Sequence, residues 1–199
     1  MPETLFVGTR NPDKLRELHR LLGEDVILRH PNGEGEVEET GDTLWENALL
    51  KAREGHLRSG LPTIADDTGL EVDALGGAPG VRSSRYAGED ASYEDNVRKL
   101  LEDLRGVEPP RRTARFRTVI AYVDGRRTKR FDGVLEGSIL EVRRGESGFG
   151  YDPVFLPEGE TRTLAEMSAD EKNAISHRGR ALRAFLAWWR EQHRGGDEG

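Results

Sequence analysis

The chain has 199 residues, with 37 acidic and 30 basic side chains and no cysteine. This length suits one α/β domain or two small lobes, and a chain without cysteine forms no disulfide and no thiolate metal site. The net charge of −7 argues against broad binding to a nucleic-acid backbone, although a pocket for a small anion can still be locally basic.

The sequence shows no membrane signal. Residues 1–14 lack the basic segment and long apolar run of a signal peptide, and no stretch approaches the roughly 20 apolar residues of a membrane span. We therefore expect a cytoplasmic protein that binds neither a membrane nor nucleic acid, with residues 194–199 as a flexible polar tail.

The first predicted elements are a strand, a tight turn and a helix. Residues 4–7 are β-prone and stop at Gly8, Asn11 is a favourable N-cap, and Pro12 is a favourable first helical residue. Because helix N-termini bind anions, this turn is a candidate phosphate site, with an ordinary strand-to-helix turn as the alternative. Its residues are Thr9, Arg10, Asn11, Pro12, Asp13 and Lys14.

A short strand at residues 26–28 and a Gly- and Glu-rich loop at 31–39 precede a second helix at 44–58. Thr43 and Glu46 have the spacing of a capping box at its start.

Three charged residues around this second helix are candidates for chemistry. Glu38 and Glu39 precede the helix and are either metal ligands or part of a solvated acidic loop. Lys51, two turns into the helix, is either a phosphate-binding cation or a solvated lysine.

Two adjacent carboxylates, Asp66 and Asp67, follow the apolar residues 63–65 and precede Thr68-Gly69. This order predicts a buried strand that ends at a turn and delivers its acids to a sheet edge, with a further strand at 70–75. Adjacent acids repel unless a metal, a proton or a cationic ligand lies between them, so the pair indicates a functional site. An Asp-rich turn is the alternative.

The middle of the chain predicts one helix followed by antiparallel β-structure. Ser92 and Asp95 cap a helix at 93–105. Asp124-Gly125 predicts a hairpin turn. The expected strands are 114–123, 128–135 and 138–142.

Residues 145–153 place two aromatic side chains and one acid among glycines. The spacing does not match a dinucleotide-binding G-x-G-x-x-G pattern. The segment suits a rigid platform for a planar ring, because glycines let the backbone come close, and an aromatic turn without a ligand is the alternative. The candidate residues are Phe149, Gly150, Tyr151 and Asp152.

The C-terminal part predicts a short helical turn that carries Lys172 and a last helix at 177–193 that Ser176 caps. His177 and Arg178 fall in the first turn of this helix, where the helix dipole disfavours cations. Cations at that position indicate an anionic or carbonyl-rich ligand.

These segments, in this order, resemble the inosine triphosphate pyrophosphatase family, also called the non-canonical purine NTP pyrophosphatases. Arg10 stands where the family usually has a small residue, and Thr68 stands where serine is usual; threonine keeps the hydroxyl. The matching segments are 9–14 (TRNPDK), 39–51 (ETGDTLWENALLK), 65–86 (ADDTGLEVDALGGAPGVRSSRY), 148–155 (GFGYDPVF) and 165–178 (AEMSADEKNAISHR).

The resemblance implies an α/β fold of the ITPase-like (Maf/Ham1) type: one domain, residues 1–199, with an elongated, twisted mixed sheet, flanking helices and two lobes around a central cleft. It also implies a homodimer that hydrolyses ITP, dITP and XTP to the monophosphate and pyrophosphate with Mg²⁺. That activity removes deaminated purines from the nucleotide pool.

The resemblance also assigns roles at the phosphate end. Residues 9–14 and Lys51 would bind the triphosphate, Glu39 and Asp67 would hold Mg²⁺, and Asp67 would be the general base. Asp66 is expected to be a supporting charge. Whether Asp67 acts as ligand, base or both stays open.

At the nucleobase end, donors from Lys172, His177 or Arg178 would pair with the 6-keto group that adenine lacks. Phe149 or Tyr151 would stack on the purine. Gly150, Asp152, Ser176 and Thr68 complete the expected set of substrate-binding residues.

Two other functions fit the same residues. One is a nucleotide pyrophosphatase for modified pyrimidine or methylated nucleotides, and the other is a purine-nucleotide sensor without turnover. The presence of Asp66, Asp67 and Glu39 favours an enzyme over a sensor.

Overall fold

The computed structural model describes residues 3–23, 26–31 and 37–193, which divide into two compact units. Unit 1 contains the described residues up to Asp67, Thr118–Gly133 and those from Arg178 onward. Unit 2 contains Thr68–Arg117 and Val134–His177. The predicted tail at 194–199 and much of the predicted loop at 31–39 lie outside the described residues.

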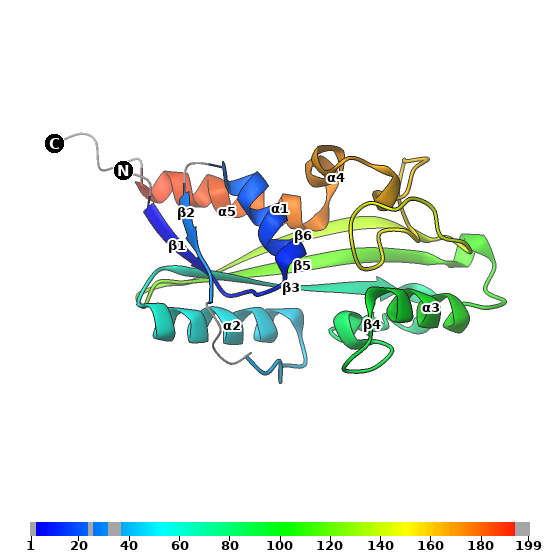
Figure 1. Cartoon of the computed structure of the whole chain (residues 1–199), viewed down its shortest axis with the longest axis horizontal. Helices are drawn as coiled ribbons and strands as arrows, with labels where there is room; N and C mark the ends of the chain where they lie inside the picture. Colours follow the sequence, from blue (N-terminus) through cyan, green and yellow to red (C-terminus); the bar gives the residue numbers. More distant parts are fainter. Residues whose placement is uncertain (1–2, 24–25, 32–36, 194–199) are drawn as a thin grey trace. The chain divides into compact units, whose positions relative to one another are not determined.

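The chain has a mixed α/β fold, as predicted, and its sheet has the hydrogen-bonded strand order β2-β1-β3-β5-β6-β7, with β4 on β3. In chain order the elements are β1 (Glu3–Val7), α1 (Pro12–Leu22), β2 (Val26–Arg29), α2 (Leu44–Ser59), β3 (Thr63–Val72), η2 (Asp73–Leu75), β4 (Pro79–Gly80), η3 (Ser83–Arg85), α3 (Tyr93–Asp103), η4 (Pro109–Arg111), β5 (Thr113–Val123), β6 (Thr128–Ile139), β7 (Phe155–Pro157), η5 (Leu164–Glu166), α4 (Ala169–Ile175) and α5 (His177–His193) (Figure 1).

Strand directions follow the prediction. β1 pairs in parallel with β2 and with β3, which confirms a β-α-β arrangement in the first third of the chain. β3 with β4 and β6 with β7 are antiparallel pairs. β5 and β6 are neighbours joined by only four residues, 124–127, and therefore form a hairpin.

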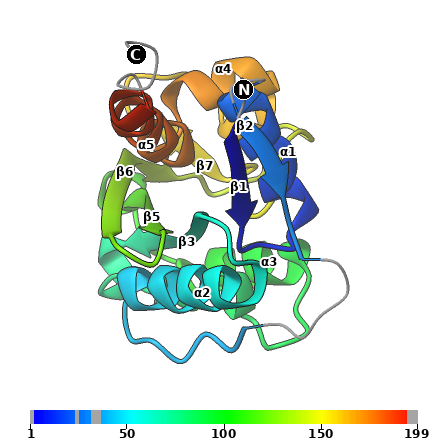
Figure 2. The ribbon, with the colours of Figure 1, turned by 90° about the vertical axis from the view of Figure 1, so that its left-hand side faces the viewer.

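In unit 1, α1 and α5 cover one face of the strands and α2 covers the other face (Figure 2). Successive residues of a strand point to opposite faces, and the two cores follow this alternation. Ile64, Ile120 and Tyr122 pack with α1 and α5. Ala65 and Ala121, one residue further along each strand, pack with α2.

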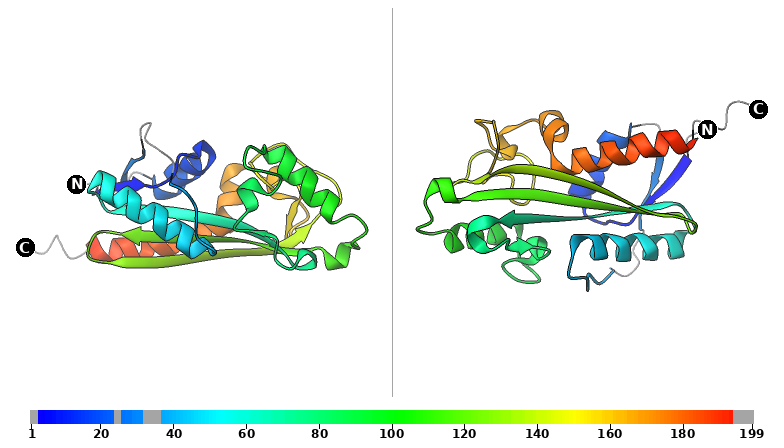
Figure 3. Two further views of the ribbon diagram at one scale, coloured as in Figure 1. Left: turned by 90° about the horizontal axis from the view of Figure 1, so that it is seen from below. Right: turned by 180° about the vertical axis from the view of Figure 1, so that it is seen from behind.

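Unit 2 has its own core, in which α3 lies on one side of β5 and β6 and α4 on the other side (Figure 3). Val97 and Leu100 of α3 contribute to it, together with Phe116 of β5 and Phe155 of β7. Tyr151 belongs to the same core and is 5 % exposed.

The predicted helix starts are confirmed. Asn11 caps α1 with Pro12 in its first turn. The predicted capping boxes begin α2 and α3, and further capping boxes begin η5 and α4; in each case a carboxylate three residues into the helix returns to the N-cap backbone. Since these pairs are local in sequence, the pattern alone was sufficient to place them.

The predicted end of the strand near Asp66 was wrong. β3 runs without interruption from Thr63 to Val72, so both acids and Gly69 lie inside the strand. The strand continues because cations from α1, α2 and α5 contact the two carboxylates, which therefore need no turn at the sheet edge.

The predicted break between strands at 135 and 138 was also wrong, because β6 is one strand from Thr128 to Ile139. Gly137 pairs with Pro157 of β7. A Cβ at Gly137 would lie 2.4 Å from the Leu156 carbonyl oxygen, so this glycine accommodates the close approach of β7 and does not break the strand.

None of the described helices combines the length and apolar character needed to span a membrane.

Candidate active site

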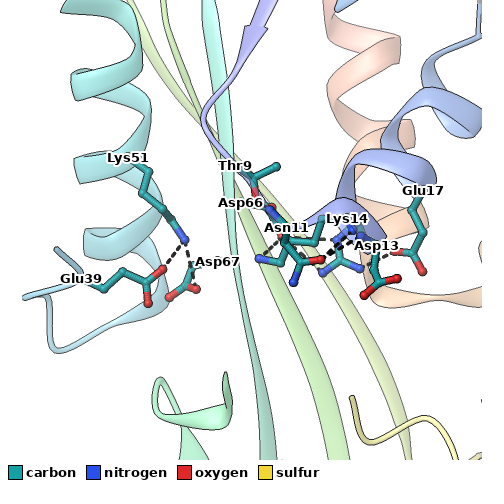
Figure 4. A network of polar contacts seen from close by, with 10 residues as sticks. Thr9, Asn11, Asp13, Lys14, Glu17, Glu39, Lys51, Asp66 and Asp67 are labelled. Atoms are coloured by element: carbon teal, nitrogen blue, oxygen red, sulfur yellow. Dashed lines mark hydrogen bonds and ion pairs between the residues drawn. The ribbon is translucent and has the colours of Figure 1, made fainter. Parts of the chain in front are cut away.

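Asp66 and Asp67 leave β3 toward opposite faces of the sheet in unit 1 (Figure 4). On the face covered by α1, Lys14 Nζ lies 3.0 Å from Asp66 Oδ2. On the face covered by α2, Lys51 Nζ lies 3.4 Å from Asp67 Oδ1. The two acids therefore belong to separate ionic clusters.

Asp66 is the centre of a buried cluster with two cations. Arg178 Nε and Nη2 each donate to Asp66 Oδ2 over 3.3 Å, and Arg178 Nη1 donates to Glu17. Burial alone would raise the pKa of Asp66, but Lys14 and Arg178 outweigh it and hold the pKa well below its usual range. Asp66 is thus a permanent anion that positions Lys14 and Arg178.

Lys14 and Arg178 respond differently to this environment. Burial lowers the pKa of Lys14 despite the nearby Asp66 carboxylate. Burial would also lower the pKa of Arg178, but Asp66 and Glu17 outweigh it and raise that pKa. Lys14 is consequently the cation that gains most from a further anion.

The turn before α1 is held against both neighbouring elements. Gly8 N–H donates to the Ile64 carbonyl over 2.8 Å, and a Cβ at Gly8 would lie 3.0 Å from the Lys51 carbonyl oxygen. Asn11 Oδ1 accepts from the backbone N–H groups of Asp13 (2.9 Å) and Lys14 (3.2 Å). The Asn11 cap thus already binds two of the N–H groups expected for phosphate.

On the α2 face, Lys51 Nζ donates to Glu39 Oε1 over 2.6 Å and to Asp67 Oδ1 over 3.4 Å. Burial raises the pKa of Asp67 and Lys51 opposes it only in part, so the carboxylate is a stronger base than an exposed aspartate. Burial would lower the pKa of Lys51, but Asp67 and Glu39 outweigh it and raise that pKa.

The loop before α2 delivers Glu39. Gly41 N–H donates to Asn47 Oδ1 over 2.8 Å, and a Cβ at Gly41 would lie only 2.6 Å from the Glu46 side chain. A glycine at this position therefore lets the loop close tightly on the helix. Glu38, the neighbouring candidate, is exposed.

The oxygens of Glu39 and Asp67 fit a divalent cation. Both carboxylates already converge on one positive atom, Lys51 Nζ, and the described residues contain no cluster of three or more His, Asp or Glu side chains able to hold a metal. Mg²⁺ characteristically takes one or two carboxylates and completes its coordination with water and substrate phosphates. A pair of acids is the donor set that this mode of binding requires.

In unit 2, Lys172 and Asp152 form a buried ion pair. Lys172 Nζ donates to Asp152 Oδ2 over 2.6 Å and lies 4.5 Å from the centre of the Phe149 ring. Asp152 Oδ2 also accepts from the Phe149 N–H over 2.9 Å. This structure therefore brings Phe149, Asp152 and Lys172 together, as the predicted base site requires.

The two predicted aromatic residues have different environments. Tyr151 lies in the core of unit 2, and its hydroxyl donates to the Ser83 carbonyl over 2.8 Å. Phe149 is half-buried and contacts the ring of Tyr93, with 5.9 Å between ring centres. Phe149 is the better candidate for stacking, while the positive φ of Gly150 forms the turn between them.

The remaining predicted residues differ in exposure. Ser176 and His177 are buried in unit 2, where the His177 ring stacks on Phe116 at 4.5 Å. Thr68 is half-buried and Arg10 is exposed. Arg178, predicted to contact the base, is held in unit 1 by Asp66 and Glu17.

Sequence reasoning missed two residues of these clusters. Glu17 holds Arg178, and it stands three residues after Lys14, on the same face of α1, so its helical spacing was a usable signal. Phe116 stacks on His177 from a strand far away in sequence, and no local pattern indicated that contact.

The chain is similar to a known protein family and to several named relatives. The Ham1 family model matches residues 5–188. A dITP/XTP pyrophosphatase of Porphyromonas gingivalis is 53% identical over 190 residues, which cover 92% of this chain and 97% of that protein. A dITP/XTP pyrophosphatase of Bacillus subtilis is 46% identical, over 89% of this chain and 92% of that protein.

Solved structures of similar fold point to the same family. The Staphylococcus aureus Ham1 protein superimposes with a TM-score of 0.85 at 36% identity, covering 95% of this chain and 99% of that chain. The nucleoside-triphosphatase / dITP/XTP pyrophosphatase of Mycobacterium abscessus gives a TM-score of 0.74 at 44% identity, covering 92% and 98%. The chain therefore belongs to the Ham1 family.

Proposed function

We propose that this protein hydrolyses the non-canonical purine nucleotides ITP, dITP and XTP to the nucleoside monophosphate and pyrophosphate. The observation that carries the proposal is the cluster of Asp67, Glu39 and Lys51, in which a basic carboxylate, a second acid and a lysine converge. Relatives of this chain in Porphyromonas gingivalis and Bacillus subtilis are named dITP/XTP pyrophosphatases.

The triphosphate would bind at the start of α1. Lys14 and Lys51 would supply positive charge, and the Thr9 hydroxyl and the Asn11 side-chain N–H groups would donate to phosphate oxygens, while the oxygens of both side chains accept from the backbone. Exposed Arg10, in the turn before α1, adds a third cation. The lowered pKa of Lys14 supports this role, because an anion beside a buried lysine relieves the penalty of burial.

Mg²⁺ would be held by Glu39 and Asp67 together with phosphate oxygens. When bound, the ion draws negative charge from the phosphoryl oxygens and so stabilises the transition state.

Asp67 would be the general base of the reaction. It takes a proton from the water that attacks the α-phosphorus, a new P–O bond forms, and the bond to the bridging oxygen breaks so that pyrophosphate leaves. Its raised pKa suits this task, because a base works best when its pKa approaches the working pH.

Recognition of the base would rest on the unit 2 residues. Lys172, Ser176 and His177 would supply polar contacts to the keto-bearing edge of the purine, Asp152 orients Lys172, and Phe149 stacks on the ring. Arg178 would have to exchange a bond to Asp66 or Glu17 for one to the base.

We further propose that the protein is a homodimer that works in the cytoplasm. Light scattering coupled to size-exclusion chromatography tests the dimer, and a mass near 22.2 kDa, that of one chain, contradicts it.

The function is tested by measuring pyrophosphate release from ITP, XTP, dITP, ATP, GTP and dTTP, with and without Mg²⁺. We expect rapid, Mg²⁺-dependent turnover of ITP, XTP and dITP and slow turnover of the others. Equal turnover of ATP and ITP contradicts the proposal. Binding of ITP without turnover indicates a sensor, and turnover restricted to modified pyrimidine nucleotides indicates the related enzyme.

A further inference from the structure

The Lys51 ammonium occupies the same place that the proposed metal ion needs. Its Nζ lies 2.6 Å from Glu39 Oε1 and 3.4 Å from Asp67 Oδ1, the two oxygens nearest to it on the two acids (Figure 4). The side chains of Lys51 and Asp67 are only 12 % and 8 % exposed. A divalent cation cannot contact both carboxylates there while the ammonium remains, because the two positive charges repel each other.

The backbone of Lys51 is fixed, so only its head group can leave. The residue lies inside α2, and its carbonyl packs so closely on the turn before α1 that a Cβ at Gly8 would come within 3.0 Å of it. The lysine stem is flexible, and its ammonium can change partners without a backbone movement. Gly8 adjoins Thr9, so the fixed backbone of Lys51 lies beside the turn that would bind phosphate.

We propose that Lys51 is a gate that couples metal binding to nucleotide binding. In the nucleotide-free protein its ammonium neutralises Glu39 and Asp67 and excludes the metal. When a metal–triphosphate complex arrives, the metal takes the two carboxylates and the ammonium moves to a phosphate oxygen. Metal alone therefore binds weakly, because it would displace the largely buried Lys51 ammonium from both of its carboxylate partners.

This inference rests on the proposed function and deepens it, since it assigns Lys51 an effect on metal loading besides phosphate contact. Coupling between two ligands is reciprocal, so the metal strengthens triphosphate binding by the same factor as the triphosphate strengthens metal binding. The chain would thus avoid holding a metal ion without substrate.

The test measures Mn²⁺ binding to the nucleotide-free protein by electron paramagnetic resonance of the free ion. We expect Lys51→Met to bind Mn²⁺ at least about tenfold more tightly than the unmodified protein, within the range typical of coupled sites. Lys51→Arg keeps the charge and should bind as weakly as the unmodified protein. Lys129→Met removes an equal charge from an exposed position and should change nothing.

Further variants identify the oxygens involved. Adding Glu39→Gln or Asp67→Asn to Lys51→Met should abolish the gain in Mn²⁺ affinity. If Lys51→Met is poorly folded, its melting temperature should rise more with Mn²⁺ than that of Lys51→Arg. Equal Mn²⁺ affinity of Lys51→Met and the unmodified protein, or an equal gain in Lys51→Arg, overturns the gate.

This outcome is independent of the proposed activity. If the unmodified protein hydrolyses ITP but Lys51→Met gains no Mn²⁺ affinity, the gate fails and the function stands. If Lys51→Met gains affinity while the unmodified protein hydrolyses no tested nucleotide, the metal position stands and the function fails.

Discussion

Asp66 and Asp67 are consecutive residues of β3, yet Asp66 pairs with Lys14 on one face of the sheet and Asp67 with Lys51 on the other. The alternation of side chains in a strand separates the two charges and gives them different partners. It also gives them opposite pKa shifts, since the pKa of Asp66 is lowered and that of Asp67 is raised. The two acids should therefore respond differently to the same substitution.

Asp67→Asn should abolish most of the activity and leave the fold intact. An amide cannot accept the proton of the attacking water, so we expect kcat for ITP to fall by about 10²- to 10⁴-fold. Steady-state pyrophosphate release measures this change, with Asp132→Asn, an exposed change on β6, as a control of unchanged activity. Activity of Asp67→Asn within about twofold of the unmodified protein refutes the general-base role.

Asp66→Asn should instead destabilise the fold. It removes the central anion of a buried cluster and leaves Lys14 and Arg178 without their shared partner, which typically costs about 3–5 kcal/mol. Urea unfolding at neutral pH measures the loss. Asp132→Asn breaks an exposed pair with Arg130 and should cost about 1 kcal/mol or less. Equal losses in the two variants would show that the Asp66 cluster is not structural.

Lys172→Met should reduce discrimination between ITP and ATP. Lys172 is held by Asp152 beside the Phe149 ring, where it would donate to the 6-keto group. Loss of a charged donor lowers kcat/KM for ITP by about 10- to 100-fold and affects ATP less. Steady-state kinetics with both nucleotides give the ratio of kcat/KM for ITP to kcat/KM for ATP. If both substrates lose the same factor, Lys172 does not read the base.

Phe149→Ala and Tyr151→Ala should separate stacking from core packing. Truncating half-buried Phe149 should raise KM for ITP with little loss of stability. Truncating Tyr151 should destabilise the protein by about 3–5 kcal/mol, because it empties part of the core of unit 2. The melting temperature and the KM for ITP of both variants test this prediction. A raised KM in Tyr151→Ala and a loss of stability in Phe149→Ala would assign stacking to Tyr151.

Tyr86 should make the protein sensitive to alkali. Burial, reinforced by a hydrogen bond from its hydroxyl to Asp103, raises the pKa of Tyr86 from 10.0 to about 12. A raised folded-state pKa stabilises the protein fully below pH 10, and this stabilisation is lost as the pH rises toward about 12.

Tyr86→Phe should reduce the decrease in the free energy of unfolding at alkaline pH. Urea unfolding at about pH 9 and about pH 11 measures this decrease in the variant and in the unmodified protein. Tyrosine absorbance during an alkaline titration gives an independent check, since the variant should lack one late ionisation. An unchanged titration curve would contradict the shifted pKa.

Local sequence was sufficient to predict the start of every capped helix. Asn11 and Pro12 lie within one turn of α1, and each capping box spans only three residues. The family resemblance also indicated which residues would gather at the phosphate end. Lys14, Lys51 and Glu39 do lie beside the two acids of β3.

The incorrect predictions concern contacts between residues that are far apart in sequence. The strand was expected to end after Asp66 and Asp67 because the counter-charge of Asp66, Arg178, lies 112 residues away in sequence and could not be anticipated. Likewise, the predicted break between residues 135 and 138 was wrong because the Leu156 carbonyl that lies against Gly137 belongs to β7, a strand distant in sequence. The burial of Tyr151 has the same cause, since its hydroxyl partner, Ser83, is 68 residues away.

The uninterrupted β3 strand limits which insertions and deletions the protein can tolerate. Removing a single residue such as Ala65 would shift the pairing parity and exchange the faces on which the two acids emerge. Asp66 would then face α2 and Asp67 would face Arg178, so the base would meet the strongest cation and lose its raised pKa. Insertions and deletions in this strand should therefore be tolerated only in pairs, even where single substitutions are harmless.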